Sequence, residues 1–184
     1  MCLRTGASGE DATGLYTDPD LLAEVYVGPY VQLEPALATV LDDGTGAAEG
    51  YVLGALDTRE FEARCESEWW PALRERYPLG SATAGSADDR VVQLIHDPPV
   101  APDHVVRDHP SHLHVDLLPR WQGGGWGRRL LERLFDQLAA AGSTGVHLGV
   151  GSGNERAIGF YRRLGFTTLE DGIPGVLFLG RRLG

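Results

Sequence analysis

The order of the elements predicted from the sequence indicates an α/β (α+β) fold, with a mixed sheet and a βαβ crossover in its middle. Strict alternation of apolar and polar residues over His112–Leu117 predicts a strand. The glycine-rich run Gly123–Gly127 follows, and the apolar spacing of Leu130–Leu138 predicts a helix. Val146–Val150 then predicts a second strand, which makes the strand–helix–strand unit at the centre of the chain.

The segment before this unit predicts one helix and one β-hairpin. Asp18 as N-cap and Pro19 at the first helical position predict a helix start, and the apolar pattern ends at Pro29. Two strands, Ala38–Leu41 and Tyr51–Leu56, are joined by an Asp-Gly turn, which is typical of hairpins.

The region 58–110 predicts a helical insertion followed by a covering loop. Thr58–Tyr77 has helical periodicity that Pro71 interrupts, and the paired Trp69 and Trp70 are interpreted as anchors packing this helix over the sheet. Residues 79–110 are rich in Pro, Gly, Ser, Ala and Asp around one short apolar run. A loop of this length in a compact domain is usually functional or mobile.

The end of the chain predicts a second helix and two closing strands. Gly142 caps the central helix, and Asn154 is placed as N-cap of the next one. Phe166–Leu169 and Val176–Leu179 are expected to be strands around a turn at Asp171–Gly175.

Length and composition narrow the class of protein. The 184 residues are expected to form one domain, 1–184, and the net charge of −10 argues against a nucleic-acid partner. All 16 basic residues are arginine, which excludes lysine Schiff-base chemistry and a Walker phosphate loop. No apolar run is long enough to cross a membrane. The two cysteines, Cys2 and Cys65, predict no disulfide framework, and a cytoplasmic location is the default expectation.

The glycine run between strand and helix predicts a site for an anion. Bare backbone N–H groups at a helix N-terminus attract phosphate or pyrophosphate. The dinucleotide pattern G-x-G-x-x-G fails, because Gly123-x-Gly125 is followed by Arg128 and Gly125-x-Gly127 by Leu130. Two readings stay open: a backbone cradle for the pyrophosphate of a nucleotide-like cofactor, or glycines that only permit a tight turn.

The pattern His112-x-His114-x-Asp116 is similar to half of a metal-binding motif. On a strand these side chains would share one face about 7 Å apart, which is wider than neighbouring ligands of one zinc ion. Since Leu117 stands where a further histidine would be needed, we expect no metal, and strand-face packing is the ordinary alternative.

Two spaced motifs give a family resemblance. The run Gln122-x-x-Gly125-x-Gly127 after a strand resembles the acetyl-CoA loop of the GNAT N-acetyltransferase superfamily. That superfamily's next motif is similar to the pattern carried by Asn154, Ala157, Phe160, Tyr161, Gly165 and Phe166. Within the superfamily, Phe61–Tyr77 and Pro110–Asp116 look similar to the acetyltransferase-like C-terminal domain of O-GlcNAcases, of which the chain would be a free-standing bacterial-type relative.

The resemblance implies a fold and a cofactor site. The fold would be GNAT-like: a mixed, splayed central sheet flanked by helices, with the first strand missing or upstream of Met1. Acetyl-CoA, as cosubstrate, would lie between the strands Leu113–Leu118 and Val146–Val150. The residues implied in binding it are Leu117 and Leu118 for the pantetheine arm, Gln122 of the motif, Gly123, Gly124, Gly125, Trp126, Gly127 and Arg128 for the pyrophosphate, and Asn154 and Tyr161.

The resemblance also implies a reaction, in which a primary amine attacks the thioester directly. Tyr161 would protonate the leaving thiolate, and the alternative is a core tyrosine on the buried helix face. Asp116 would take the proton of the amine, and the alternative is a structural hydrogen-bond acceptor. The function predicted is an acetyl-CoA-dependent N-acetyltransferase with an unknown amine acceptor, as monomer or homodimer. The competing prediction is an inactive pseudo-acetyltransferase that binds acyl-CoA or a protein.

Overall fold

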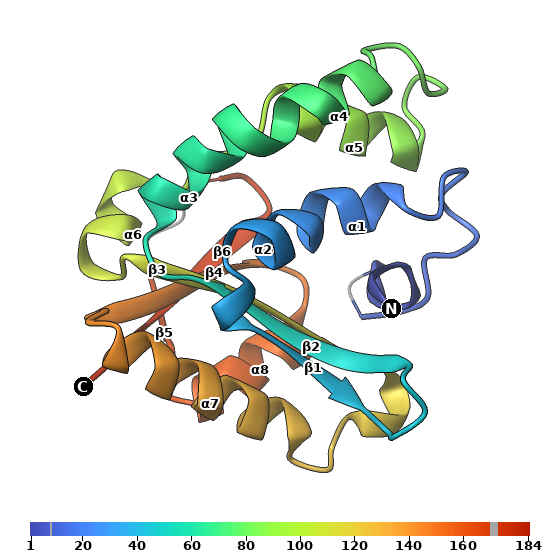
Figure 1. The fold of residues 1–184 in the computed structure, drawn as a ribbon. Helices are drawn as coiled ribbons and strands as arrows, with labels where there is room; N and C mark the ends of the chain where they lie inside the picture. The colour runs from blue at the N-terminus through green and yellow to red at the C-terminus, as the bar shows by residue number, and fades with distance from the viewer. Residues whose placement is uncertain (8, 170–172) are drawn as a thin grey trace.

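The centre of the structure is a six-stranded sheet with the strand order β1-β2-β3-β4-β6-β5 (Figure 1). The computed structural model describes residues 1–7, 9–169 and 173–184. All neighbouring strands pair antiparallel except β3 and β4, which are parallel and connected by the long helix α7. The predicted mixed sheet with a central crossover is therefore confirmed. The strands are β1 (Ala38–Asp42), β2 (Ala48–Ala55), β3 (Ser111–Leu117), β4 (Gly145–Gly151), β5 (Thr167–Thr168) and β6 (Val176–Arg182).

Helices cover both faces of this sheet and bury two separate cores (Figure 1). One face carries α7 (Trp126–Ala140) and α8 (Glu155–Arg163), and the other carries the helices that come before β3 in the chain. Alternation along each strand divides its side chains between the two cores, so Val52 belongs to one core and Leu53 to the other. The second group of helices is α1 (Leu21–Tyr26), α2 (Gly28–Leu33), α3 (Thr58–Arg64), α4 (Trp70–Arg76) and α5 (Ala87–His96).

The N-terminal segment differs from the prediction in detail. The first helix begins at Leu21 with Asp20 as N-cap, while the carboxylate of Asp18 accepts from the Asp20 N–H and from the Tyr77 hydroxyl. Pro29 lies in the first turn of α2, where its missing N–H is no loss, so it starts a helix instead of only ending one. Among the described residues no strand precedes α1; a 3₁₀ helix, Cys2–Thr5, packs against β3 instead.

The expectation of a covering loop over 79–110 is wrong. This segment contains α5 and a further helix, α6 (Asp103–Asp108). Helix α5 begins at Ser86, whose hydroxyl accepts from the Asp89 N–H, and it buries Val91, Val92 and Ile95. Of the Ser and Asp residues that suggest a loop by composition, Ser86 is the cap of this helix, and Asp88 is buried and accepts from the backbone N–H groups of Thr17 and Asp18.

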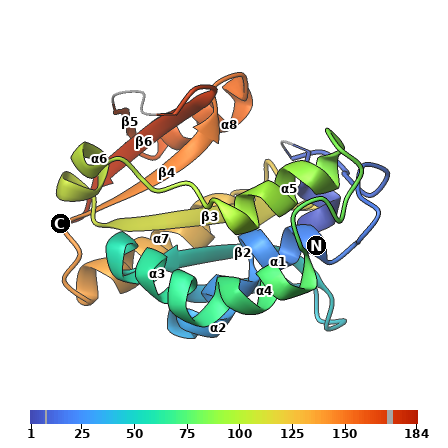
Figure 2. The ribbon, with the colours of Figure 1, turned by 90° about the horizontal axis from the view of Figure 1, so that it is seen from above.

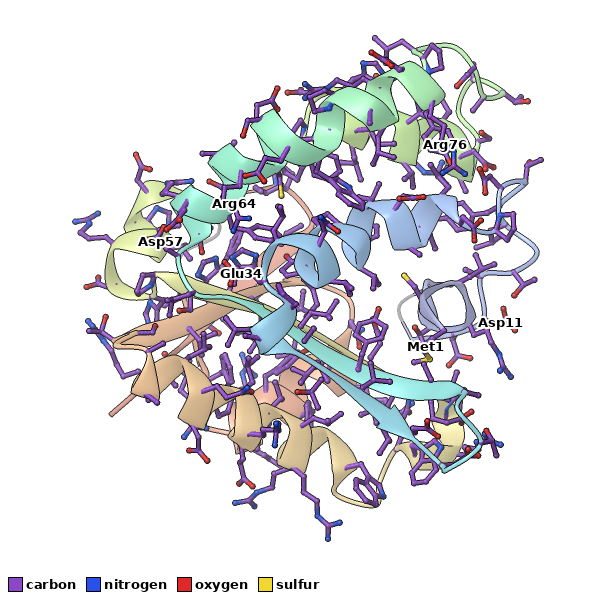
Figure 3. The ribbon with its side chains drawn as sticks, viewed as in Figure 1. Met1, Asp11, Glu34, Asp57, Arg64 and Arg76 are labelled. Carbon is purple, nitrogen blue, oxygen red and sulfur yellow. The ribbon has the colours of Figure 1, made fainter. Side chains whose placement is uncertain are left out.

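The interruption predicted at Pro71 is present and takes a specific form. A π-helical turn, Cys65–Trp69, separates α3 from α4, and Pro71 lies in the first turn of α4. Trp70 is buried and the Trp69 indole donates to the carbonyl of Glu24 at 2.9 Å, so both rings anchor the insertion. Arg64 of α3 reaches across to α2 and donates to the Leu33 carbonyl, close to Glu34 (Figure 3).

The C-terminal elements follow the predicted order with different lengths. Asn154 caps α8 by accepting from the Ala157 N–H, as expected. Strand β5 has only two residues, whereas β6 continues to Arg182. The predicted turn begins at Asp171 and Gly172, which lie outside the described residues. In the part of the chain that the structure describes, no helix has the length and apolar character needed to span a membrane.

Strands β3 and β4 separate soon after they begin. Their ladder contains only the pairs Ser111–Val146 and His112–His147, whereas β2 pairs with β3 over six residues. Figure 2 shows the two strands together at one end and diverging toward the other. The splayed sheet predicted from the family resemblance is therefore present, and the gap opens beside Leu113–Leu117 of β3.

We predict that Gly145→Ala destabilises the protein by about 2 kcal/mol, the usual cost of overpacking. A Cβ atom at Gly145 would lie 2.7 Å from the backbone oxygen of Asp108, which cannot rotate away. Gly151→Ala, in the same strand with nothing within 4 Å of the added Cβ, is the matched control and should change stability by less than about 0.5 kcal/mol. Urea unfolding midpoints measure both, and equal shifts would refute the packing argument.

Candidate functional site

The gap between β3 and β4 exposes backbone groups of β3. The Leu118 N–H donates to the Glu49 carbonyl at 3.0 Å, and the β2–β3 register alternates from there. His114 and Asp116 therefore direct their backbone groups at β2, and Val115 and Leu117 direct theirs into the gap. Leu118, which was expected to offer backbone groups to a ligand, uses its N–H for Glu49, and its carbonyl accepts from the Trp121 N–H at 2.9 Å.

Six consecutive amides border the same gap at the start of α7. None of the backbone N–H groups of residues 123–128 donates to an acceptor in the described part of the chain; the first that does is Arg129, to the Gly125 carbonyl. The first turn of α7 also contains no acidic side chain, although carboxylates are favoured at that position. We call residues 123–128 the amide cradle; free donors at the positive end of a 15-residue helix suit a phosphate or pyrophosphate.

The glycines of this segment have distinct roles. Gly123 and Gly125 adopt φ angles of 78° and 81°, which other residues rarely adopt. Gly127 is buried, and an added Cβ would lie 3.1 Å from both Leu117 and Phe160, so its lack of a side chain lets α7 approach β3 and α8. An added Cβ at Gly124 would make only ordinary van der Waals contact, 3.5 Å from the Trp126 ring. Three of the four glycines are thus required by backbone conformation or packing, and the resulting turn leaves the amides free.

Gln122 is an internal bridge. Its side-chain nitrogen donates to the Leu117 carbonyl at 2.8 Å, and its side-chain oxygen accepts from Arg156 of α8. Its own N–H donates to Pro119, so neither its backbone nor its amide group faces the cradle as a free donor. Asn154 uses its side-chain oxygen for the α8 cap. Arg128 pairs with Glu132 at 2.6 Å, which leaves its backbone N–H for the cradle.

Tyr161 is a buried residue of α8. Its ring packs between Phe160 and Phe166, and the residue is only 8 % exposed. Its hydroxyl has no hydrogen-bond partner among the described residues. Burial raises the pKa of Tyr161, and the negative charge of Asp116 raises it further. Tyr161 belongs to the core under α7 and α8, whereas Asp116 is bonded to Tyr51 of the other core, so the two predicted catalytic side chains come from opposite faces of the sheet.

Asp116 is held by the neighbouring strand. The Tyr51 hydroxyl, directly across the β2–β3 ladder, donates to Asp116 Oδ2 at 2.7 Å. Burial raises the pKa of Asp116, and the hydrogen bond from Tyr51 opposes part of that rise. The sequence predicted Asp116 and missed Tyr51, because the partnership depends on strand register, which the two separate strand patterns do not define.

Three neutral imidazoles extend from Asp116 along the same face. Thr58 gives its hydroxyl proton to Pro110, so it accepts from His112 Nδ1, and His112 Nε2 accepts from the Tyr30 hydroxyl at 2.8 Å. His147 Nδ1 donates to the His109 carbonyl at 2.7 Å. Burial lowers the pKa of His114 and of His147 to about 4 each.

These side chains pack as an aromatic row. His114 contacts the rings of Tyr26 and Tyr30 edge-on, and His112 lies between His114 and His147. No group of three or more His, Cys, Asp or Glu side chains able to hold a metal is present among the residues that the structure describes. The His114 side chain makes no hydrogen bond in that part of the chain and packs only against rings, as the strand-face alternative predicts.

Charge is distributed unequally between the two sides of the site. Residues 1–110 carry 20 acidic and 7 basic side chains, whereas residues 111–184 carry 6 acidic and 9 basic ones. The amide cradle belongs to the basic part, and helices α1–α5 belong to the acidic part. The field of the chain therefore favours an anion at the cradle and a cation on the side of α1–α5.

The sequence matches the Acetyltransferase (GNAT) family over residues 44–166. This chain belongs to the GNAT acetyltransferase family. Members of the family transfer acetyl groups from acetyl-CoA. The match includes the amide cradle, Asp116, Asn154 and Tyr161.

Individual proteins are also similar to this chain. Protein O-GlcNAcase of Rattus norvegicus is 28% identical over 181 residues, which cover 95% of this chain and 20% of that protein. The chain thus spans about a fifth of the O-GlcNAcase it matches. The ribosomal protein bS18-alanine N-acetyltransferase of Salmonella typhimurium is 36% identical over 81 residues, covering 44% of this chain and 51% of that protein. The crystal structure of SsHAT matches with a TM-score of 0.90 and 43% identity, covering 100% of this chain and 90% of that one.

We predict that the neutral imidazoles make the fold acid-sensitive. The pKa of His147 is about 4 in the folded state and about 6.5 when unfolded, so the unfolded chain binds the proton first. Stability is therefore retained above about pH 6.5 and falls as the pH drops toward 4. The variant His147→Asn keeps a donor for the His109 carbonyl. Between pH 7 and pH 5, its free energy of unfolding should fall by about 1 to 2 kcal/mol less than that of the wild type. Denaturant unfolding at both pH values tests this; identical losses would contradict it.

Proposed function

We propose that the protein is an acetyl-CoA-dependent N-acetyltransferase in which a primary amine attacks the thioester directly. The observation that carries the proposal is the set of six free amides at the start of α7 next to the point where β3, the strand of Asp116, separates from β4. A pyrophosphate-binding end and a pair of proton-transfer groups are the two parts that direct acetyl transfer needs.

The residues present fit acetyl-CoA. The amide cradle would hold the pyrophosphate, and the free backbone groups of Val115 and the Leu117 N–H would pair with the pantetheine arm as an added strand does. The Leu117 N–H faces the gap, where it can donate to the thioester carbonyl and stabilise the charge that develops on its oxygen. Asn154, with its side-chain nitrogen free of the cap, would contact the arm from the α8 side.

Tyr161 and Asp116 would move the two protons of the reaction. The amine nitrogen forms a bond to the acetyl carbon as the carbon–sulfur bond breaks; Asp116 takes a proton from the nitrogen, and Tyr161 gives one to the sulfur. The raised pKa keeps Tyr161 protonated at any working pH, as a donor requires. The raised pKa of Asp116 makes it a stronger base than an exposed aspartate.

The acceptor would approach from the side of α1–α5. His114 and Tyr26 lie on that side near the acidic helices, and the sheet face there also carries Asp116. The excess of acidic residues in 1–110 supports an acceptor with positive charge besides the reacting amine, such as a polyamine or a basic peptide.

One observation favours the second candidate, a binding protein without turnover. The Asp116 carboxylate is engaged by Tyr51, and the 3₁₀ helix Cys2–Thr5, with Cys2 and Thr5 both buried, packs against β3 beside it. A base in this position has to exchange its Tyr51 contact or share it with the amine.

Acetyl-CoA binding and turnover separate the candidates. At 100 times its Kd, acetyl-CoA should stabilise the fold by about 2.7 kcal/mol in a thermal unfolding experiment. Release of CoA should follow with at least one member of a panel of monoamines, polyamines and basic peptides. Binding without release for every amine would favour the binding protein, and no thermal shift would reject both.

We predict that Tyr161→Phe lowers kcat by about 10²-fold or more and leaves the KM for acetyl-CoA nearly unchanged. The change removes only the hydroxyl proton and keeps the ring between Phe160 and Phe166. Tyr77→Phe is the control, because it removes a hydroxyl that is hydrogen-bonded to Asp18 and has no role in the proposed reaction. It should retain the full rate. A wild-type rate for Tyr161→Phe would exclude the donor role.

We predict that Asp116 sets the acidic limb of the pH–rate profile. The ionised carboxylate is the active form, so activity should fall as the pH drops below its pKa. Tyr51→Phe removes a hydrogen bond that lowers this pKa and should move the limb to higher pH, while Asp116→Asn should abolish it along with most of the rate. An unmoved limb in Tyr51→Phe would show that another group titrates.

A further inference from the structure

Glu49 is a buried carboxylate that the reaction does not use. Its side chain is 4% exposed, and it is the second residue of β2, next to the turn of the β1–β2 hairpin. Buried carboxylates are costly unless they are paired, so its partners indicate what it does. All of them come from the short connection between β3 and the amide cradle.

Glu49 binds this connection at three points. Its carbonyl accepts from the Leu118 N–H at 3.0 Å. Its Oε2 atom accepts from Arg120 Nε at 2.6 Å and from the Trp121 indole N–H at 3.0 Å. Arg120 also approaches Asp43, on the other side of the hairpin tip, at 3.5 Å. The β1–β2 hairpin is thereby fixed to residues 118–121.

The contact continues into the cradle through two tryptophans. Trp121 packs edge-on against Trp126, with 5.6 Å between ring centroids, and Trp126 is the first residue of α7 and a member of the cradle. The guanidinium of Arg129 lies over the Trp126 ring, 4.8 Å from the ring centroid. Glu49 is therefore connected to the cradle through Trp121, whose ring packs against the ring of Trp126.

Contacts within the amide cradle do not fix its backbone conformation. Its amides make no internal hydrogen bonds among the described residues, and Gly123, Gly124 and Gly125 are exposed and have no side chains to pack. Glycine also loses the most backbone freedom on ordering. The direction of the free N–H groups is consequently imposed from the two ends of the segment, by Glu49 and Trp121 before it and by Gly127 after it.

We propose that Glu49 is a positioning residue for the amide cradle: through Arg120, Trp121 and Trp126 it preorganises the amides that receive the cosubstrate's pyrophosphate. This inference rests on the proposed binding of acetyl-CoA at the cradle. Preorganisation raises affinity because the ordering cost is met before the ligand binds.

The sign of the effect separates positioning from electrostatics. Glu49→Gln removes a negative charge near an anion site, so a purely electrostatic role would strengthen CoA binding. Positioning predicts the opposite: Kd for CoA, measured by calorimetry, should rise about tenfold, which is about 1.4 kcal/mol and in the range of a lost hydrogen bond to a charged group.

Glu132→Gln is the matched control. Glu132 also pairs with an arginine of the same region, Arg128 at 2.6 Å, and loses the same charge, but it is exposed on α7 and contacts neither tryptophan. Its Kd for CoA should stay the same or fall. Trp121→Phe removes one hydrogen bond, retains an aromatic ring against Trp126 and should raise Kd about threefold; it decides the question if Glu49→Gln does not fold.

A spectroscopic readout reports on the positioning itself. The chain has four tryptophans, and the indole N–H signal of Trp121 in a ¹H–¹⁵N spectrum should move in Glu49→Gln without bound CoA and stay in place in Glu132→Gln. Unchanged CoA affinity in both Glu49→Gln and Trp121→Phe overturns the inference. Failure of the wild-type protein to bind CoA would instead reject the proposed function, and the indole signal would still report the contact.

Discussion

The early separation of β3 from β4 is the constraint on which the site depends. Two residue pairs join these strands, and beyond them β3 is hydrogen-bonded only to β2. In an ordinary parallel pair, β4 would satisfy the backbone groups of Val115 and Leu117. Here the backbone groups of Val115 and the Leu117 N–H remain free, and the Leu117 carbonyl accepts from the Gln122 side chain, close to the amides of α7. A single irregularity of the sheet thus leaves free backbone groups of β3 close to those of α7.

Two cores of similar extent hold the strands apart at that gap. The helices α7 and α8 bury one sheet face and α1–α5 the other, so each strand is fixed by packing even where its ladder is missing. Gly127 brings α7 close to Leu117 and Phe160, and the Gln122 side chain replaces β4 as the partner of the Leu117 carbonyl. One side chain thus supplies a hydrogen bond that a neighbouring strand would otherwise make.

The polar groups on the α1–α5 side show how burial tunes chemistry. Desolvation raises the pKa of Asp116 and lowers that of His114 to about 4, so the carboxylate becomes more basic while the imidazole remains neutral. The hydrogen bond from Tyr51 opposes part of the rise in the pKa of Asp116. The same face therefore offers one ionisable base and a row of neutral rings to a substrate that enters from the acidic helices.

Much of this arrangement follows from the local sequence. Alternation over His112–Leu117, the glycine run, the cap at Asn154 and the helical spacing around Tyr161 each follow from interactions within a few residues, and they predicted the crossover, the anion site and the family. The composition of residues 79–110 predicts a loop, although the Ser86 cap of helix α5 is a local signal. Only the tertiary structure decided which backbone groups of β3 are free, that Leu118 is not among them, and that Tyr51 and Glu49 hold Asp116 and the cradle in place. Those contacts join residues between 65 and 72 positions apart, and strand register and side-chain packing, which no single segment encodes, determine them.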